Sequence, residues 1–343
     1  MIMNSIIVGI DVSKEIFDRD QIKTKTESFT SILIFIGNNF ELQRPNKVQT
    51  RKFNNSSEGF NKLVTWLKSI EPEHVCMEAT GIYWKNLAKY LYDYGYKVSV
   101  VNPARIKGFA MSKLSRTKTD KADSVLIADF CKAMKPEAWY PQPLYIQELQ
   151  QLVNRLNVLI KHKTQETNRL EGASKAIANN IQMHIEFLET QIKEIEQLIN
   201  DHIKNNKDLH NKAMLLESIP GIGAKTQAVV LAFLADIEKF SSAKQVVAFV
   251  GLNPKHRQSG SSVRGASRIS RTGNSDLRKS FYMPAMSALR HNCIIKQFSQ
   301  RLSDTGKPKM LILIAAMRKL LHIIYGVLKH NSPFNPNVLI NQK

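Results

Sequence analysis

Residues 5–12 read SIIVGIDV, a run of apolar and β-branched residues that ends beside the acid Asp11. A run of this kind predicts a buried β-strand. Two further runs have the same character, HVCME at residues 74–78 and KVSVV at residues 97–101, and segments with helical spacing precede and separate them. Strands that alternate with helices predict an α/β domain with partly parallel strand pairing, which we place at residues 1–140.

The middle of the chain has the spacing of long amphipathic helices. Leucines repeat at intervals of three and four residues between positions 149 and 159, and isoleucines and a leucine do the same between positions 185 and 199. Such heptad-like seams predict either an antiparallel helix hairpin or an intermolecular coiled coil. We assign residues 141–208 to this central coiled-coil region, with a structural or oligomer-forming role.

The third part, residues 209–343, is predicted to be helical and contains the short motif IPGIG at residues 219–223. A turn of this kind between two helical segments resembles a helix-hairpin-helix, in which glycines let backbone N–H groups approach a phosphate. An ordinary Pro-Gly connection between helices is the alternative, and the motif alone does not decide between the two.

The charge balance of the chain points to a polyanionic partner. The 343 residues include 49 Lys and Arg against 29 Asp and Glu, which gives a formal net charge of +20. Such a basic chain predicts nucleic-acid binding, with a generally basic, solubilising surface as the alternative. A hydrophobic content of 43% is enough for packed cores and excludes disorder as the main state.

Other features of the composition argue against further classes of protein. Since no apolar run approaches the roughly 18 residues that a membrane span needs, no membrane partner is expected. The N-terminal segment lacks the basic start of a signal peptide. The three cysteines are far apart and form no CxxC pair, which argues against a disulfide scaffold or a zinc ribbon and predicts a cytoplasmic protein.

Four acids occupy positions from which they can converge. Asp11 and Glu78 end two predicted strands, and Asp120 and Asp123 lie three residues apart at a predicted helix start, TKTDKADSVLIADF. Four carboxylates held together repel one another unless a cation neutralises them. Oxygen-only ligands suit Mg²⁺ or Mn²⁺, and two such ions can stabilise the attacking and leaving oxygens of a phosphodiester. The four acids therefore predict a metal site for phosphoryl transfer.

Each acid also has an ordinary structural interpretation. Asp11 can be a turn residue after a strand, and Glu78 can cap a helix through the following Thr80. Asp120 can be the N-cap of its helix, with Asp123 a first-turn partner of the helix dipole. For any single acid the structural role is favoured, whereas the order strand, strand, helix for all four favours the metal site.

Basic residues flank the last two acids. The segment 105–121 has six Lys or Arg against one acid. Cations of this kind hold a nucleic-acid backbone while a metal site performs the chemistry. We assign nucleic-acid binding to five of them, which are Arg105, Lys107, Lys113, Arg116 and Lys118.

A second basic segment, residues 255–279, has seven Lys or Arg against one acid. Its glycines and small residues let a backbone lie close to phosphates, so we interpret it as a loop. Ser259, Ser261 and Ser262 lie at its tip, and chemistry alone favours a phosphate ligand over a nucleophile for a serine in such a loop. The cations assigned to nucleic-acid binding are Arg257, Arg264, Arg268, Arg271, Arg278 and Lys279.

Taken together, these motifs resemble the DEDD-type insertion-sequence transposases, a family that is related to the Piv-type DNA invertases and includes the bridge-RNA-guided recombinases. The resemblance covers nearly the whole chain in order. It rests on GIDVSKEIFD, MEATGIYW, VNPARIKGFAMSKLSRTKTDKAD, LLESIPGIG, GLNPKHRQSG and RISRTGNSDLRK. The TKTDKAD block and the RQSG block with the following GN and LR residues are the most specific of these motifs.

The resemblance implies a RuvC-like, RNase H-like N-terminal domain, whose acid tetrad corresponds to the four acids above, and a helical C-terminal transposase domain. The serine of the RQSG block, Ser259 in this chain, is then the nucleophile, and a small misregister would move this role to Ser261 or Ser262. The family further implies a nucleoid-associated protein of a bacterial or archaeal cell. It also implies a dimer or tetramer in which the tetrad of one subunit meets the serine of another, and a structured guide RNA that pairs with donor and target DNA.

These observations lead to a site-specific DNA recombinase that mobilises an insertion sequence, with Mg²⁺ or Mn²⁺ at the acids and a phosphoserine intermediate. One alternative is a RuvC-like junction endonuclease that uses metal-activated water and forms no protein–DNA adduct. Another is a catalytically inactive nucleic-acid-binding scaffold, against which the four intact acids argue. The sequence names neither the donor and target sites nor the oligomeric state.

Overall fold

The computed structural model describes residues 6–12, 29–36, 48–114, 119–259, 263–270 and 272–337. Within these ranges, only the backbone is described at 29–36, 48–50, 120–121, 256–259 and 263–268. Contacts divide the chain into two units, Met1–Pro141 and Gln142–Lys343. The finer division into residues 1–140, 141–208 and 209–343 stays a prediction.

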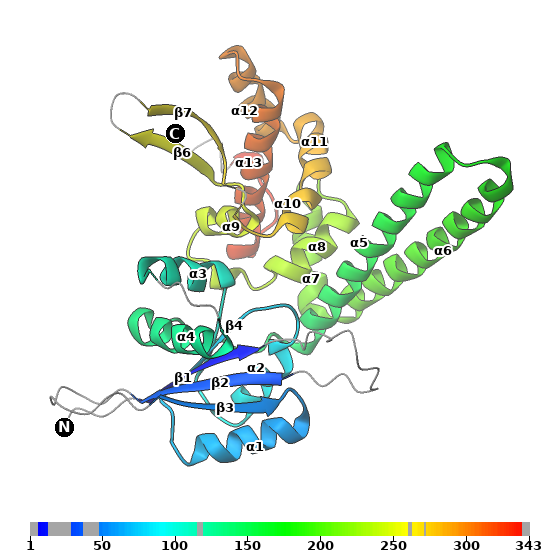
Figure 1. Cartoon of the computed structure of the whole chain (residues 1–343). Helices are drawn as coiled ribbons and strands as arrows, with labels where there is room; N and C mark the ends of the chain where they lie inside the picture. The colour runs from blue at the N-terminus through cyan, green and yellow to red at the C-terminus, as the bar shows by residue number, and fades with distance from the viewer. Residues whose placement is uncertain are drawn as a thin grey trace. The chain divides into compact units, whose positions relative to one another are not determined.

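A five-stranded mixed sheet forms the centre of the first unit, in the order β3-β2-β1-β4-β5 (Figure 1). The pairs β1–β2 and β2–β3 are antiparallel, whereas β1–β4 and β4–β5 are parallel. This order and these directions are those of an RNase H-like sheet. The three predicted strands are present as β1, β4 and β5. The strands are β1 (Ile6–Val12), β2 (Phe29–Ile36), β3 (Val48–Asn54), β4 (His74–Glu78) and β5 (Val98–Val101).

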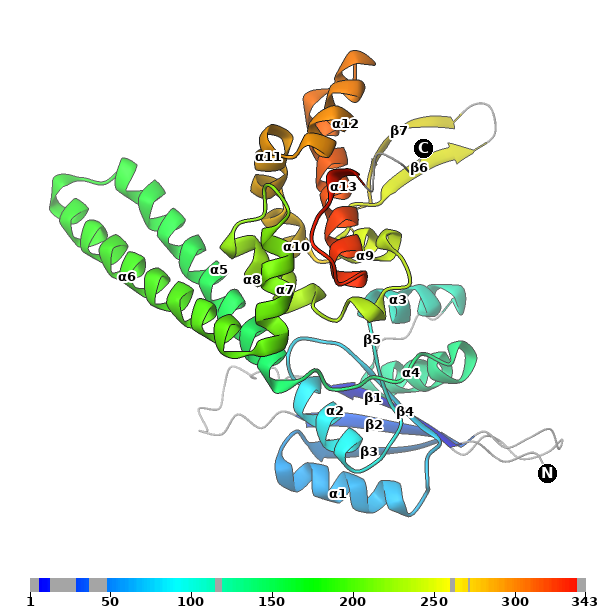
Figure 2. The same ribbon diagram turned by 180° about the vertical axis from the view of Figure 1, so that it is seen from behind.

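Helices cover both faces of this sheet because β1 and β4 are apolar on both sides. Helices α1 (Ser57–Lys68) and α2 (Trp84–Asp93) pack on one face, against a core that includes Val8 and Ile10 of β1 (Figure 2). On the other face, α3 (Pro103–Ser112) and α4 (Asp120–Met134) pack against a second core that includes Ile7. Alternate residues of one strand thus enter different cores.

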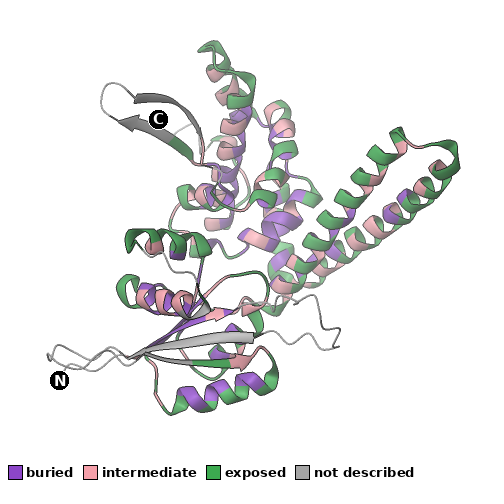
Figure 3. Ribbon diagram, viewed as in Figure 1, coloured by how far each residue is buried: buried purple, intermediate pink, exposed green. Residues whose placement is uncertain are grey.

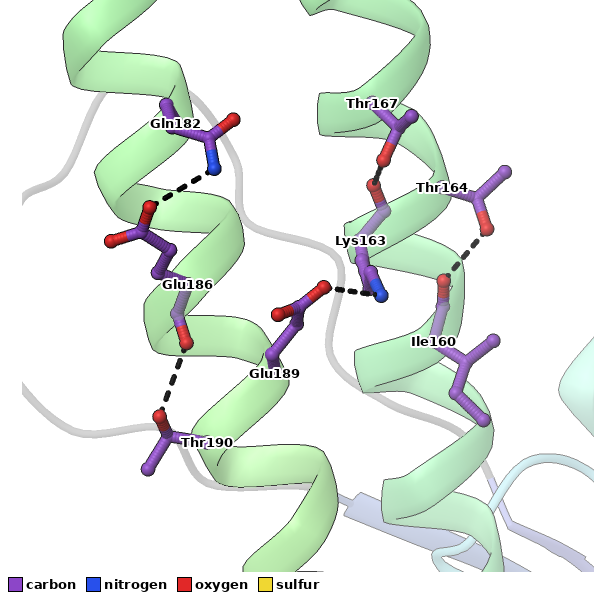
Figure 4. A network of polar contacts seen from close by, with 8 residues as sticks. All are labelled: Ile160, Lys163, Thr164, Thr167, Gln182, Glu186, Glu189 and Thr190. Atoms are coloured by element: carbon purple, nitrogen blue, oxygen red, sulfur yellow. Dashed lines mark hydrogen bonds and ion pairs between the residues drawn. The ribbon is translucent and has the colours of Figure 1, made fainter.

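Two long helices open the second unit and pack against each other as a hairpin. They are α5 (Leu144–Glu171) and α6 (Lys175–Asn205), and the predicted seam is buried at positions such as Leu156 and Leu188. Figure 4 shows one ion pair between the helices, from Lys163 Nζ to Glu189 Oε1 at 2.7 Å. Of the two predicted arrangements, the structure has the hairpin within one chain, and association between chains stays a prediction.

The rest of the second unit is a helical body around the last helix, α13. Its apolar residues, among them Leu320, Leu321 and Ile324, are buried against α7, α9, α11 and α12 (Figure 3). The elements are α7 (Lys207–Glu217), α8 (Ala224–Leu234), the short 3₁₀ helix η1 (Ile237–Lys239), α9 (Ala243–Val250), β6 (Pro254–Ser259), β7 (Val263–Ile269), α10 (Ser275–Ser280), α11 (Tyr282–His291), α12 (Cys293–Asp304) and α13 (Lys309–Lys329).

One helix among the described residues, α13, is long and apolar enough to cross a membrane by length and composition. More than half of its apolar window is buried inside the unit, and the residues from 312 to 329 are buried or half-buried. This burial is what a core helix of a helical body shows, and it gives the apolar composition a packing role.

The IPGIG motif connects α7 to α8 and does so with a close packing contact. Gly221 has φ +103°, and a Cβ at this position would lie 2.9 Å from the backbone N and Cα of Ala288 on α11. Both the left-handed backbone and the short distance require glycine here. Asn292 Nδ2, which is buried, donates to the Pro220 carbonyl oxygen at 3.4 Å. Packing therefore requires the first glycine of the motif, and phosphate binding by the motif stays a prediction.

We expect Gly221→Ala to lower the free energy of unfolding by about 1–3 kcal/mol, because the new Cβ meets backbone atoms in a strained conformation. The matched control is Gly223→Ser, since a Cβ at Gly223 meets no described atom within 4 Å and serine suits this N-cap position. Urea unfolding followed by circular dichroism measures both. Equal stability of Gly221→Ala and the wild type would contradict this packing.

Candidate active site

The first two predicted acids lie at the same edge of the sheet. The parallel strands β1 and β4 are in register, with Ile10 beside Met77, so that Asp11 and Glu78 are the next residues along the two strands. Both side chains are half-buried. Because parallel strands end at the same edge, the backbone brings these two acids to one edge of the sheet, and their role in a metal site stays a prediction.

These two acids also share one face of the sheet. Ile10 and Met77 point into the core beneath α1 and α2. Since side chains alternate along a strand, Asp11 and Glu78 face the other side, on which Ile7 and Cys76 pack against α4. The acids therefore face the layer that carries the other two acids of the predicted tetrad.

Helix α4 lies directly on β1 at Gly9. A Cβ at Gly9 would lie 2.3 Å from the carbonyl oxygen of Ser124 and 2.5 Å from the amide nitrogen of Ala128. Such contact between backbones is open only to glycine. Gly9, two residues before Asp11, is thus the positioning residue that the sequence analysis missed, although a lone glycine within an apolar strand signals a close approach of this kind.

Two buried cysteines hold the far end of α4 against β4. Cys131 on α4 is hydrogen-bonded to Cys76 on β4, which lowers the pKa of the Cys131 thiol to about 6; His74 acts in the same direction and burial acts against it. The same hydrogen bond, together with burial, raises the pKa of Cys76. Cys131, near the end of α4, thus lies beside the start of β4, whereas Ser124, near the start of α4, contacts Gly9 of β1. Helix α4 therefore runs opposite to the strands, and its first turn lies at the edge where Asp11 and Glu78 are found.

That first turn contains Asp120 and Asp123. Thr119 is the N-cap, because its side chain accepts a hydrogen bond from the Ala122 amide at 3.1 Å. The structural alternative for Asp120, that it caps this helix, is therefore wrong: the threonine before it takes this role, and Asp120 is the first helical residue. Asp123 is half-buried, and the side chain of Asp120 lies outside the described residues.

Glu78 does not have the structural role considered for it either, that of a helix cap. Its Oε1 accepts a hydrogen bond from Thr80 Oγ1 at 2.7 Å. The N-cap of the following helix α2 is Tyr83, without a side-chain capping bond. Glu78 thus contacts the Thr80 hydroxyl and does not cap α2, which leaves carboxylate lone pairs for a further ligand.

The donor set at this edge suits a hard divalent cation. Carboxylate oxygens from adjacent strand ends and a facing helix turn are ligands that Mg²⁺ and Mn²⁺ prefer, and the first turn of α4 adds no soft ligand. Among the side chains that the structure describes, no group of three or more His, Cys, Asp or Glu is close enough to hold a metal ion. Asp120 is not among those side chains.

Of the five basic residues predicted near the acids, three are described. Arg105 on α3 places its guanidinium 5.3 Å from the ring centroid of Phe130 on α4. Lys113, just after α3, forms an ion pair with Asp129 on α4. These two cations link α3 to α4, and Lys107, like them, is exposed. Arg116 and Lys118 lie outside the described residues.

The serine-containing segment is a β-hairpin, and our interpretation of it as a loop is wrong. Strands β6 and β7 are antiparallel with Ser259, the last residue of β6, paired with Val263. The register shifts between Lys255 and Arg257, as at a β-bulge. Backbone hydrogen bonds between the two strands stabilise this segment, which has no alternating apolar pattern. Because that pattern is missing, its composition suggested a loop. Ser261 and Ser262 lie outside the described residues.

Of the other cations predicted in this region, the side chains of Arg278 and Lys279 are described and those of the rest are not. Arg278 is half-buried, and its Nη1 donates to the Val250 carbonyl oxygen at the end of α9 at 3.2 Å, which is a structural role. Lys279 is exposed and lies 3.6 Å from Asp276. For Arg257, Arg264 and Arg268 the structure gives only the backbone in β6 and β7, and Arg271 lies outside the described residues.

An RNase H-like sheet with acids at one edge, followed by a helical unit, defines a class of protein that performs phosphoryl transfer on nucleic acids. Comparison with known proteins gives the family. Residues 213–300 match the family model described as "Transposase IS116/IS110/IS902 family", and residues 42–177 match a DEDD transposase model of the IS110 type.

Similarity extends over the full chain. The pilin gene-inverting proteins of Moraxella bovis and Moraxella lacunata are each 32% identical to it, over 98% of this chain and 99% of theirs. The transposase for insertion sequence element IS1111A of Coxiella burnetii is 24% identical over 66% of this chain and 69% of that protein. The chain therefore belongs to the IS116/IS110/IS902 family of transposases, which cut and rejoin DNA, as its motifs predicted.

We expect Gly9→Ala to lower the free energy of unfolding by about 1–3 kcal/mol and to reduce DNA processing, because the added Cβ displaces α4 from β1. The control is Gly108→Ala on α3, where a Cβ meets no described atom within 4 Å and helix propensity favours alanine. Urea unfolding and a recombination assay measure the two effects. If Gly9→Ala leaves both unchanged, α4 does not rest on β1 as described.

Proposed function

We propose that this protein is a site-specific DNA recombinase that mobilises an insertion sequence, and that its acids and Ser259 divide the chemistry. The observation that carries the proposal is the common edge and face of Asp11 and Glu78, with the first turn of α4 at the same edge. Full-length similarity to pilin gene-inverting proteins supports recombination between defined sites as the reaction.

Asp11, Glu78, Asp120 and Asp123 hold one or two divalent cations in this proposal. When bound, Mg²⁺ or Mn²⁺ polarises the scissile phosphate and stabilises the charge that develops on its oxygens. The acids themselves fix the position of that charge at the end of β1 and β4. Two hydrogen bonds described above support these positions. Thr80 Oγ1 donates to Glu78, and the Ala122 amide donates to Thr119 Oγ1 at the start of α4.

Ser259 is the nucleophile that we propose for strand cleavage. Its Oγ forms a bond to phosphorus while the phosphorus–oxygen bond to the neighbouring deoxyribose breaks. The serine proton leaves to a base or to water, and the departing oxygen takes up a proton to become a free hydroxyl. In strand exchange, a hydroxyl of the partner strand attacks the phosphoserine and releases Ser259. The position of Ser259 at the end of β6 supports access to DNA.

The basic residues hold the DNA backbone in this proposal. Arg257, Arg264 and Arg268 belong to β6 and β7, and Lys107 is exposed on α3. Arg105, Lys113 and Arg278 contribute to binding through the elements they hold in place, given their contacts within the protein. Binding should therefore weaken as salt concentration rises.

The partners that we propose are donor and target DNA, a structured guide RNA and further copies of the chain, as a dimer or tetramer. The formal net charge of +20 supports nucleic-acid partners, and the RNA rests on the resemblance of the motifs to those of bridge-RNA-guided recombinases. The exposed part of the α5–α6 hairpin offers a surface for assembly. We place the protein at the nucleoid of a bacterial or archaeal cell.

Covalent trapping tests this division of the chemistry. Incubation with its flanking DNA, co-expressed RNA and Mg²⁺, followed by denaturation, should give DNA-shifted protein. We expect Ser259→Ala and Asp11→Ala each to reduce the adduct by at least about a thousand-fold, because one removes the nucleophile and the other a metal ligand.

The controls for this trapping are Ser261→Ala and Ser262→Ala, which remove the neighbouring hydroxyls and should leave the adduct intact. If one of them abolishes the adduct and Ser259→Ala does not, the nucleophile is misassigned. If DNA is cut without any adduct, and only Asp11→Ala prevents it, the enzyme is a metal-dependent endonuclease and Ser259 only contacts DNA.

A further inference from the structure

The second unit contains a cavity of about 280 Å³ between the end of α13 and the segment that follows it. This cavity, which we call the α13 cavity, is separate from Ser259 in the sequence and is lined entirely by residues 319–335. Its polar lining residues are Lys319, His322, His330, Ser332 and Asn335.

The α13 cavity is lined by basic and neutral groups only. Lys319, His322 and His330 all lie on one side of α13 or just after it, and no carboxylate is among the lining residues. Two more cations act on His322 from close by, Lys244 of α9 and Arg318 of α13. Like charges this close repel one another, and a bound anion would relieve that repulsion.

Three of these cations, Lys244, Arg318 and Lys319, lack acidic partners within the described part of the chain. Neither Lys244, Arg318 nor Lys319 forms an ion pair with a described carboxylate, whereas Lys329 on the same helix pairs with Glu238. Arg318 Nε is buried and has no hydrogen-bond partner among the described atoms. Arg318 is not among the residues that line the α13 cavity, so it contributes to the positive charge near His322 and not to the lining itself.

His322 is poised to change its charge with the ligand. Burial first, and then the charges of Arg318, Lys319 and Lys244, lower the pKa of its imidazole below the usual value. Burial and these charges therefore favour the neutral imidazole in the free protein. An anion in the α13 cavity would reverse part of this shift, because it offsets the three neighbouring cations.

We propose that the α13 cavity binds a phosphate group of a nucleic-acid strand together with part of the attached nucleotide. Lys319, His322 and His330 face the phosphate, and Ser332 and Asn335 supply further donors. Pro333 and Phe334 offer an apolar surface against which a sugar or a base packs. The inference rests on nucleic-acid binding by this chain and is independent of the chemistry assigned to Ser259.

The size of the α13 cavity favours one nucleotide over a longer ligand. A volume of about 280 Å³ lies just below the range of sites that enclose a drug-sized molecule. A strand that passes along the surface can place a single phosphate and its sugar or base in such a cavity while the neighbouring nucleotides stay outside. Free inorganic phosphate offers the same charge and is the competing source of the ligand.

Two variants on α13 that each remove one positive charge, and one that keeps it, test the proposal. Lys319→Gln removes a cation that lines the cavity, Lys329→Gln removes one that is paired with Glu238 outside it, and Lys319→Arg keeps the charge. The probe is a short fluorescent single-stranded oligonucleotide, made as DNA and as RNA, and its affinity is measured by anisotropy over a range of salt concentrations at fixed pH.

We expect Lys319→Gln to weaken binding of the DNA or the RNA probe roughly tenfold, as for the loss of one charged hydrogen bond. The slope of log affinity against log salt should fall by about one. Lys329→Gln and Lys319→Arg should each stay close to the wild type. Equal effects of Lys319→Gln and Lys329→Gln would overturn the proposal, because they would show general charge attraction only.

Two further measurements separate the sources of the ligand. Titration calorimetry with inorganic phosphate alone should give much weaker binding than the oligonucleotide, and phosphate should compete only at high concentration. A site that binds phosphate as tightly as the oligonucleotide would be an anion site and would overturn the assignment to a strand.

Affinity for the oligonucleotide should also rise as pH falls, since binding favours protonated His322, and His322→Gln should flatten this dependence. If the affinity of His322→Gln depends on pH as strongly as that of the wild type, the phosphate is not placed beside His322.

Discussion

The direct contact between the backbones of β1 and α4 is the constraint on which the candidate active site depends. A side chain at Gly9 would collide with the carbonyl oxygen of Ser124, so the strand needs glycine two residues before Asp11. This contact sets the height of α4 above the sheet and keeps its first turn at the strand edge where Asp11 and Glu78 end. A methyl group at position 9 would push α4 away from β1 and would move Asp120 and Asp123 away from the strand acids. A metal site tolerates little such displacement.

The acid edge illustrates what a sequence can predict and where it stops. Strands β1, β4 and β5 were predictable because each is a short apolar run, and the parallel register then placed Asp11 beside Glu78. Strand β3 reads VQTRKFN and is an edge strand with one neighbour, so it needs no apolar pattern. Strand β2 reads FTSILIFI, an apolar run that also signals a strand and was not among the predicted ones. At the start of α4, threonine and aspartate are both good N-caps, and only the hydrogen bond to Ala122 identifies Thr119.

Charge shows the same limit for binding residues. The excess of cations correctly indicated a DNA-processing family, yet a count of charges does not distinguish a cation that binds a ligand from one that holds the protein together. Arg278 donates to the end of α9 and Lys113 pairs with Asp129, whereas Lys319 has no acidic partner among the described residues and lines a cavity. Pairing and burial separate these roles, and neither can be read from composition. For Ser259 the residues alone favoured a phosphate ligand, and only the family register favours the nucleophile.

The central claim is that the acids of β1, β4 and α4 form one site for a divalent cation. Titration of the full-length protein with Mn²⁺, followed by electron paramagnetic resonance, measures that site without any DNA substrate. We expect saturable binding in the wild type, and at least about a tenfold loss of affinity in Asp11→Asn, Glu78→Gln and Asp123→Asn, because each removes a charged ligand. Exposed Asp304→Asn on α12 should bind as the wild type does. Equal Mn²⁺ affinity of the wild type and all three site variants would contradict the claim.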